Sequence, residues 1–254
     1  MRGKCLFGPV WSRRLGRSLG INLTPYKTCN LDCVYCECGF TTILTVERRE
    51  HIATETVIES LARYRESARF RANPPSSLTF AGFGEPTLHS GLGEIVRFVK
   101  RHFPENRLAL ITNGTLFGLY PELLDEVQGV DLIIPSLDAG REETFETVNR
   151  PHPALDFERY VEGLLQLRER FRGEMWLEVF LVKGLNDTEA EVEALRKHIS
   201  RLAPHRVHLN SVDRPPAEEW VQAPSPERLR EIAQVLRAEI IVSPPPSVLS
   251  SPCP

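Results

Sequence analysis

Short apolar runs alternate with longer segments of helical periodicity along most of the chain. Six of these runs predict β-strands, and all but the first carry too few polar positions for strands with one face in water. We therefore expect buried parallel strands. The runs cover residues 19–23, 77–80, 108–112, 132–136, 175–181 and 207–211.

Helices are predicted between and after these strands, where apolar residues recur every three or four positions. Asp156 and Asp187 each stand where a side chain commonly caps a helix N-terminus. The predicted helices cover residues 54–65, 91–102, 121–127, 156–170, 187–202 and 227–239.

This alternation favours a parallel sheet with helices outside it. A complete (β/α)8 barrel needs about 250 residues for its repeats alone, and the pattern shows only six strands. We therefore expect an α/β fold of the partial (β/α)6 TIM-like barrel type, with an open doubly wound sheet as the alternative. In both architectures ligands bind at the carboxyl ends of the strands.

The length of 254 residues suits one main domain. We expect a basic N-terminal extension at 1–18, the barrel at 19–216, and a C-terminal helix with a proline-rich tail at 217–254. No apolar run is long enough to span a membrane, and the N-terminus lacks the apolar stretch of a signal peptide. We expect a cytoplasmic protein with no membrane partner.

Charge is distributed unevenly along the chain. The net charge of −3 argues against bulk attraction to nucleic acid or anionic lipid. However, all charged residues before Asp32 are basic, which allows a local anion site. Arg13, Arg14 and Arg17 are candidates for binding RNA phosphates, but the sequence carries no recognisable RNA-binding motif. Pairing of these arginines with acidic residues of the same chain is the favoured interpretation.

Four of the six cysteines crowd into ten positions, which indicates a metal site in a reducing compartment. Cys29, Cys33 and Cys36 have the spacing C-x3-C-x2-C. Three thiolates on a short loop can hold three corners of a cubane cluster and leave the fourth iron open. A zinc site that recruits Cys38 is the alternative, although Cys36 and Cys38 stand close together for zinc ligands. Cys5 and Cys253 are too few for a second cluster.

The cysteine motif, with Tyr35 directly before its last cysteine, resembles the signature of the radical S-adenosylmethionine (radical SAM) superfamily. The wider stretch GPVWSRRLGRSLGINLTPYKTCNLDCVYC resembles an Fe-S oxidoreductase subgroup related to wyosine tRNA-modifying enzymes. The resemblance implies a [4Fe-4S] cluster held by Cys29, Cys33 and Cys36, with S-adenosylmethionine bound to its open iron beside Tyr35. It further implies an external one-electron donor of flavodoxin or ferredoxin type, and a 5′-deoxyadenosyl radical that abstracts hydrogen from the substrate.

The segment TFAGFGEPTLH follows the second predicted strand and resembles the GGE element of that superfamily. The resemblance implies that Gly82, Gly84 and Glu85 receive the amino group of the methionine moiety. Phe83 separates the two glycines, so the strict tripeptide is absent. Without the cysteines, the same residues would indicate an ordinary tight turn.

Other polar residues at the ends of the later strands are further candidates for cofactor binding. Each has a structural alternative: a turn at Asn113, a helix cap at Asp138 and a surface ion pair at Arg150. The remaining candidates are Ser136, Asn186 and Asn210.

The sequence therefore predicts a radical SAM enzyme whose substrate it does not reveal. A tRNA- or RNA-modifying radical enzyme and an activating enzyme that installs a glycyl radical are the enzymatic alternatives. A non-catalytic iron–sulfur or zinc protein is the third, and it would leave S-adenosylmethionine uncleaved.

Overall fold

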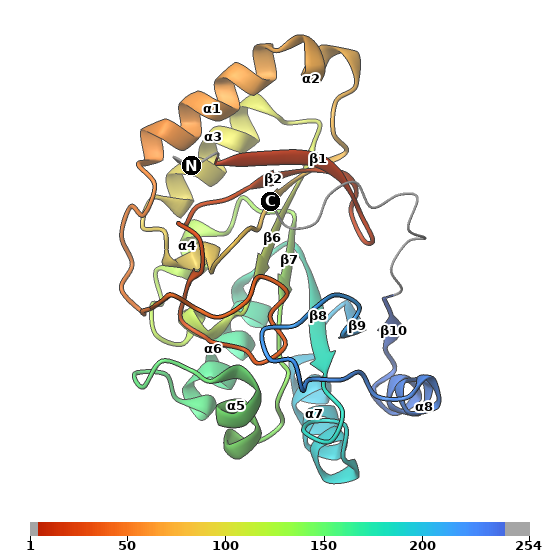
Figure 1. Ribbon diagram of the computed structural model, residues 1–254. Helices are drawn as coiled ribbons and strands as arrows, with labels where there is room; N and C mark the ends of the chain where they lie inside the picture. Colours follow the sequence, from red (N-terminus) through yellow and green to blue (C-terminus); the bar gives the residue numbers. More distant parts are fainter. Residues whose placement is uncertain (1–4, 242–254) are drawn as a thin grey trace.

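The fold is an open, curved, mostly parallel sheet covered by helices on its outer face (Figure 1). The computed structural model describes residues 5–241. Eight strands lie in the order β1-β2-β5-β6-β7-β8-β9-β10, and only the β1–β2 pair is antiparallel. The strands are β1 (Leu6–Ser12), β2 (Gly16–Ile21), β5 (Ser77–Phe80), β6 (Arg107–Thr112), β7 (Leu132–Pro135), β8 (Glu174–Leu181), β9 (Arg206–Ser211) and β10 (Glu239–Ile240). A separate two-stranded ribbon joins β3 (Thr28–Cys29) to β4 (Ile43–Leu44).

All six predicted strands are present, and they form the central run from β2 to β9. The sequence pattern did not predict β1 or β10. Gly8 and Pro9 interrupt the apolar pattern of β1, and proline is tolerated here because β1 lies at a sheet edge. The segments expected to flank the barrel therefore contribute strands to the same sheet.

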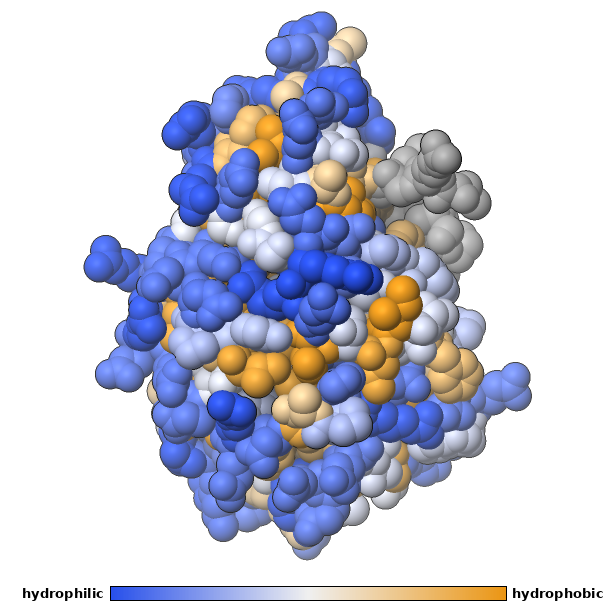
Figure 2. All heavy atoms as spheres, turned by 90° about the vertical axis from the view of Figure 1, so that its left-hand side faces the viewer, coloured by the Kyte–Doolittle hydropathy of each residue, from blue (hydrophilic) through white to orange (hydrophobic). Residues whose placement is uncertain are grey.

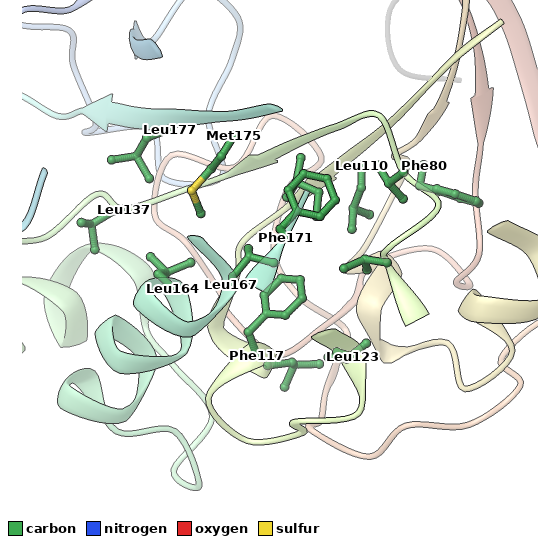
Figure 3. Close-up of a cluster of buried hydrophobic side chains, with 14 of the residues drawn as sticks. Phe80, Leu110, Phe117, Leu123, Leu137, Leu164, Leu167, Phe171, Met175 and Leu177 are labelled. Atoms are coloured by element: carbon green, nitrogen blue, oxygen red, sulfur yellow. The ribbon is translucent and has the colours of Figure 1, made fainter. Parts of the chain in front are cut away.

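The outer face of the sheet carries the main hydrophobic core. Strand residues such as Met175 and Leu177 lie above helix residues such as Leu164 and Leu167, and all four side chains are fully or almost fully buried (Figure 3). Since side chains alternate along a strand, the neighbouring positions face the interior of the curved sheet. That interior holds a smaller apolar cluster of Leu15, Ala109, Leu132, Ile134 and Trp176.

The helices confirm most of the helical pattern. They are α1 (Thr54–Glu66), α2 (Ala68–Ala72), α3 (Leu92–His102), α4 (Leu123–Glu126), α5 (Glu142–Asn149), α6 (Phe157–Arg170), α7 (Glu189–Leu202) and α8 (Pro226–Leu236), with short 3-10 turns at η1 (Pro86–Leu88) and η2 (Thr115–Phe117). Asp156 caps α6 as predicted, through a 2.7 Å bond from the Arg159 amide. The predicted cap of α7 was wrong: Thr188 accepts from the Glu191 amide, whereas Asp187 accepts from the Gly184 amide.

The predicted fold class is confirmed: the fold is α/β, and its sheet is mostly parallel and not closed. Within residues 5–241 no helix is long and apolar enough to cross a membrane. The face on the left of Figure 1 is largely hydrophilic, with apolar side chains gathered near its middle (Figure 2). The predicted proline-rich tail lies outside the described residues.

Candidate functional site

The loop that carries Cys29, Cys33 and Cys36, called the cysteine loop below, follows β2. It is held by hydrogen bonds to distant parts of the chain. The Val34 amide donates to the Val148 carbonyl at 3.0 Å, and the Asp32 amide donates to the Asn149 carbonyl at 3.0 Å, so the end of α5 holds the loop. On its other side, the Glu218 amide donates to the Val34 carbonyl at 3.0 Å. Figure 1 shows the same arrangement, with the loop beside the segment that follows β9.

Each of the three motif sulfurs has a side-chain nitrogen beside it. Lys27 Nζ lies 3.0 Å from Cys36 Sγ, and Asn149 Nδ2 lies 3.4 Å from Cys33 Sγ. Asn113 Nδ2 lies 3.8 Å from Cys29 Sγ. Nitrogen donors at sulfur stabilise thiolates and set the properties of iron–sulfur clusters.

Lys27 is an unusual residue for this place, because its side chain is only 3% exposed and its φ is +51°. Lysine is almost never fully buried without a partner. Its partner here is the Cys36 sulfur, which raises the Lys27 pKa against the opposing effect of burial. The sequence interpretation missed Lys27, and its position two residues before Cys29 was the only available signal.

The three thiols differ in acidity. Burial raises the pKa of Cys29 to about 12 and that of Cys33 well above its ordinary value. A hydrogen bond from Cys38, with a further contribution from Lys27, lowers the pKa of Cys36 to about 5. Cys36 is therefore a thiolate at neutral pH, whereas Cys29 and Cys33 must release protons to bind a metal. Cys38, which the alternative zinc site would recruit, contacts Cys36 through this bond.

Tyr35 packs against β8, where its ring stacks on Phe180 at a centroid distance of 4.0 Å. Its hydroxyl donates to Asp138 Oδ2, which also accepts from Asn149 Nδ2 at 2.9 Å. Asp138 Oδ1 accepts from the Phe180 amide at 2.8 Å. Asp138 thus joins the cysteine loop, α5 and β8. The sequence interpretation did not assign Asn149, although it lies next to the candidate Arg150.

The glycines after β5 allow close contact between two loops. A Cβ on Gly84 would stand 1.9 Å from the Thr28 carbonyl oxygen, and one on Gly82 would stand 2.2 Å from Asn22 Oδ1. Gly82 also has a φ of +154°, which side chains disfavour. Glycine at both positions therefore lets the segment after β5 press against the cysteine loop.

Glu85 is 3% exposed and accepts four hydrogen bonds from its own chain. Oε1 accepts from the Thr87 amide and hydroxyl and from the Thr112 hydroxyl, at 3.0, 2.6 and 2.6 Å. Oε2 accepts from the Asn113 amide at 2.8 Å. The carboxylate therefore fixes the turn after β6, and its contact with a methionine amino group stays a prediction.

The later candidates occupy different depths. Asn113 forms a turn, as its structural alternative predicted, by accepting from the Thr115 amide and hydroxyl. Asn186 is completely buried and bonds to main-chain groups of Asp138, Phe180 and Val182, and its contact with the cofactor stays a prediction.

Three further candidates have partners within the chain. The Ser136 carbonyl accepts from the Tyr160 hydroxyl. Arg150 pairs with Glu218 at 2.5 Å, which is the surface ion pair considered for it. Asn210 Oδ1 accepts from Arg13 Nη1 at 3.3 Å.

The donor set fits an iron–sulfur cluster. Three cysteines on one loop, a buried cation at one sulfur and amide donors at the other two are suited to a sulfur-rich anionic group. In the described part of the chain, no three His, Cys, Asp or Glu side chains lie close enough together to hold a single metal ion.

Comparison with known proteins identifies the family. Residues 23–199 match the model of the Radical SAM superfamily. A UPF0026 protein of Methanocaldococcus jannaschii is 34% identical over 92% of this chain and 71% of its own length. A protein of Brachyspira hyodysenteriae named GTPase Obg is 35% identical over 94% of this chain, which spans only 34% of that protein.

A solved structure of TYW1 with a lysine-pyruvate adduct bound has a TM-score of 0.63 at 18% identity, over 87% of this chain and 72% of that one. At this identity the likeness concerns the fold. The family match, which begins before the cysteine loop and continues through β5, β6, β7 and β8, implies S-adenosylmethionine and an iron–sulfur cluster as cofactors. The chain is an enzyme and belongs to the radical SAM superfamily.

Proposed function

We propose that this enzyme binds a [4Fe-4S] cluster through Cys29, Cys33 and Cys36 and cleaves S-adenosylmethionine reductively. The observation that carries the proposal is the nitrogen donor beside each of the three sulfurs. When bound, these cofactors supply a 5′-deoxyadenosyl radical that abstracts hydrogen from the substrate, and the protein supplies position and exclusion of water.

The residues around the loop have separate roles in this proposal. Lys27 offsets part of the negative charge that three thiolates bring into a partly buried site. Asn113 and Asn149 orient the other two sulfurs, and Asn149 is itself held by Asp138. Tyr35 fixes the loop against β8 through its ring and its hydroxyl.

We place the amino group of S-adenosylmethionine at the main chain around Gly82 and Gly84. Both glycines let the segment after β5 pack against the loop that carries the cysteines, which brings this main chain close to the proposed cluster. Glu85 is assigned a positioning role, because its carboxylate holds the neighbouring turn. We place the nucleoside at the ends of β7 and β9, near Ser136 and Asn210.

Radical SAM enzymes generally receive an electron from outside, and we propose a one-electron donor of flavodoxin or ferredoxin type. The test is direct: reduced flavodoxin should replace a chemical reductant in supporting S-adenosylmethionine cleavage. If the chemical reductant supports cleavage but neither reduced flavodoxin nor reduced ferredoxin does, this assignment is contradicted.

The proposed function is tested by anaerobic reconstitution with iron and sulfide, followed by reduction in the presence of S-adenosylmethionine. We expect 5′-deoxyadenosine and methionine from the native protein and from Cys5→Ala, since Cys5 bonds to Ser60 away from the loop. Cys33→Ala should form neither product. A colourless zinc protein that leaves S-adenosylmethionine intact would overturn the proposal.

A further inference from the structure

A cavity of about 210 Å³ lies on the inner face of the sheet, between the β1–β2 hairpin and the neighbouring strands. Its floor includes Ser18 of β2 and Thr79 of β5, whose hydroxyls are 2.7 Å apart. It extends to Ala81, directly before Gly82. The cavity therefore adjoins the place proposed for S-adenosylmethionine.

Three arginines from two distant segments line this cavity: Arg13 and Arg14 from the hairpin turn, and Arg214 from the segment after β9. The side chains of Arg13 and Arg14 are only 18% and 12% exposed. Arg17 of the same basic segment instead bonds to the Asn73 carbonyl and does not line the cavity. In the folded chain Arg13 and Arg14 therefore face the cavity, whereas Arg17 lies outside it.

Each of these guanidinium groups uses the same nitrogen in its contacts with the described residues. Arg13 Nη1 contacts Asp213 at 2.8 Å, Arg14 Nη1 contacts Glu178, and Arg214 Nη1 contacts Glu37 at 3.1 Å. A guanidinium carries five N–H donors in a planar fork. The acidic partners therefore hold the arginines in place and leave Nε and Nη2 of each for a further acceptor.

Part of the cavity lining is apolar. It includes Phe7, Val10 and Trp11 of β1 and Ile111 of β6. Trp11 is 64% exposed, an unusual state for a tryptophan that has no binding role. An arginine fork suits a carboxylate or phosphate, and the apolar wall suits a hydrocarbon or ring attached to it.

We propose that this cavity binds the substrate, and that the substrate is a small organic acid with an oxyanion head, carboxylate or phosphate, on an apolar body. The substrate assignment rests on the proposed function, because it places the acid beside the S-adenosylmethionine site. The anion-binding property rests only on the arginines and the walls of the cavity.

Calorimetric titration of the anaerobically reconstituted protein, with S-adenosylmethionine present, tests the proposal. Benzoate and phenyl phosphate are the probes, and benzyl alcohol and inorganic phosphate are their controls. We expect one or both aromatic acids to bind at least about tenfold more tightly than either control, which is the effect of one charge-assisted contact or of a buried ring. The acid that binds more tightly shows whether the preferred head group is a carboxylate or a phosphate. Equal binding of acid and alcohol would overturn the proposal.

Substitutions locate the binding. Arg14→Gln and Arg13→Gln should each weaken the binding of the acid about tenfold, whereas Arg17→Gln should leave it unchanged. Because Arg14→Gln leaves Glu178 without its partner, the double variant Arg14→Gln/Glu178→Gln provides a version with balanced charge and should show the same loss. Acid binding that survives both the Arg13 and the double variants would overturn the proposal.

The two proposals fail separately. Native protein that cleaves S-adenosylmethionine but binds neither aromatic acid refutes the acid cavity and leaves the proposed function standing. Native protein that binds the acids through Arg13 and Arg14 but never cleaves S-adenosylmethionine refutes the proposed function and, with it, the substrate assignment.

Discussion

Lys27 Nζ lies 3.0 Å from Cys36 Sγ, in a side chain that is almost completely buried. A cation in this position favours negative charge on the sulfur and on any cluster bound to it. Reduction adds one negative charge to an iron–sulfur cluster, so hydrogen bonds and positive charge near its sulfurs raise its reduction potential.

Replacement of this cation should make the cluster harder to reduce. We expect Lys27→Met to lower the reduction potential by on the order of 100 mV, which corresponds to the loss of one charge-assisted hydrogen bond in a one-electron couple. Redox titration monitored by electron paramagnetic resonance, without S-adenosylmethionine, measures it. Lys197→Met, on the exposed surface of α7, is the control. An unchanged potential in Lys27→Met would show that the ammonium does not act on the cluster.

The cysteines should differ in their importance for iron binding. Cys33→Ala should lose most of the bound iron, because it removes a predicted ligand, while Cys38→Ala should retain it, because Cys38 is not one of the three predicted ligands and acts on Cys36 through a hydrogen bond. Iron and sulfide analysis after reconstitution measures both. Loss of iron in Cys38→Ala to the level of Cys33→Ala would favour a site with four cysteine ligands.

The Glu85 carboxylate should contribute to stability through its hydrogen bonds. In Glu85→Gln an amide NH₂ replaces one acceptor and meets a main-chain donor, the Thr87 amide or the Asn113 amide. A buried donor left unpaired costs about 1–3 kcal/mol, so urea unfolding should show a loss of that size. Glu94→Gln, exposed on α3, should unfold like the native protein. Equal stability of Glu85→Gln would contradict the positioning role.

Asp138 should make stability depend on pH. Burial raises its pKa to about 6, above the value in the unfolded chain. The folded state therefore holds the proton more tightly, and this contribution to stability is complete below about pH 4 and is lost as the pH rises through 6. The shift of about two pKa units corresponds to about 3 kcal/mol.

Asp138→Asn isolates this effect, because the amide does not titrate. The free energy of unfolding of the native protein, minus that of Asp138→Asn, should fall by up to about 3 kcal/mol between pH 4 and 6.5 and stay level above pH 7. Urea unfolding at several pH values measures it. A difference that rises over this interval would mean that folding lowers the pKa instead.

Local patterns in the sequence determined most of the sheet. The six central strands were predictable because buried parallel strands are short uninterrupted apolar runs, and the helices because one face repeats every three or four residues. The cysteine motif was equally local, since three ligands within eight positions define a loop site by spacing alone. The family followed from that motif and its surroundings.

Contacts between distant segments decided the rest. The sequence pattern did not predict β1, because its glycine and proline are typical of a loop. Only pairing with β2 makes this segment a strand. Asn149 reaches Cys33 across 116 positions, and Arg14 reaches Glu178 across 164. A polar residue carries no periodic signal that tells which partner it will meet. Only the contacts made in the folded chain show that Lys27 and Asn149 reach the motif sulfurs and that Arg13 and Arg14 line the cavity.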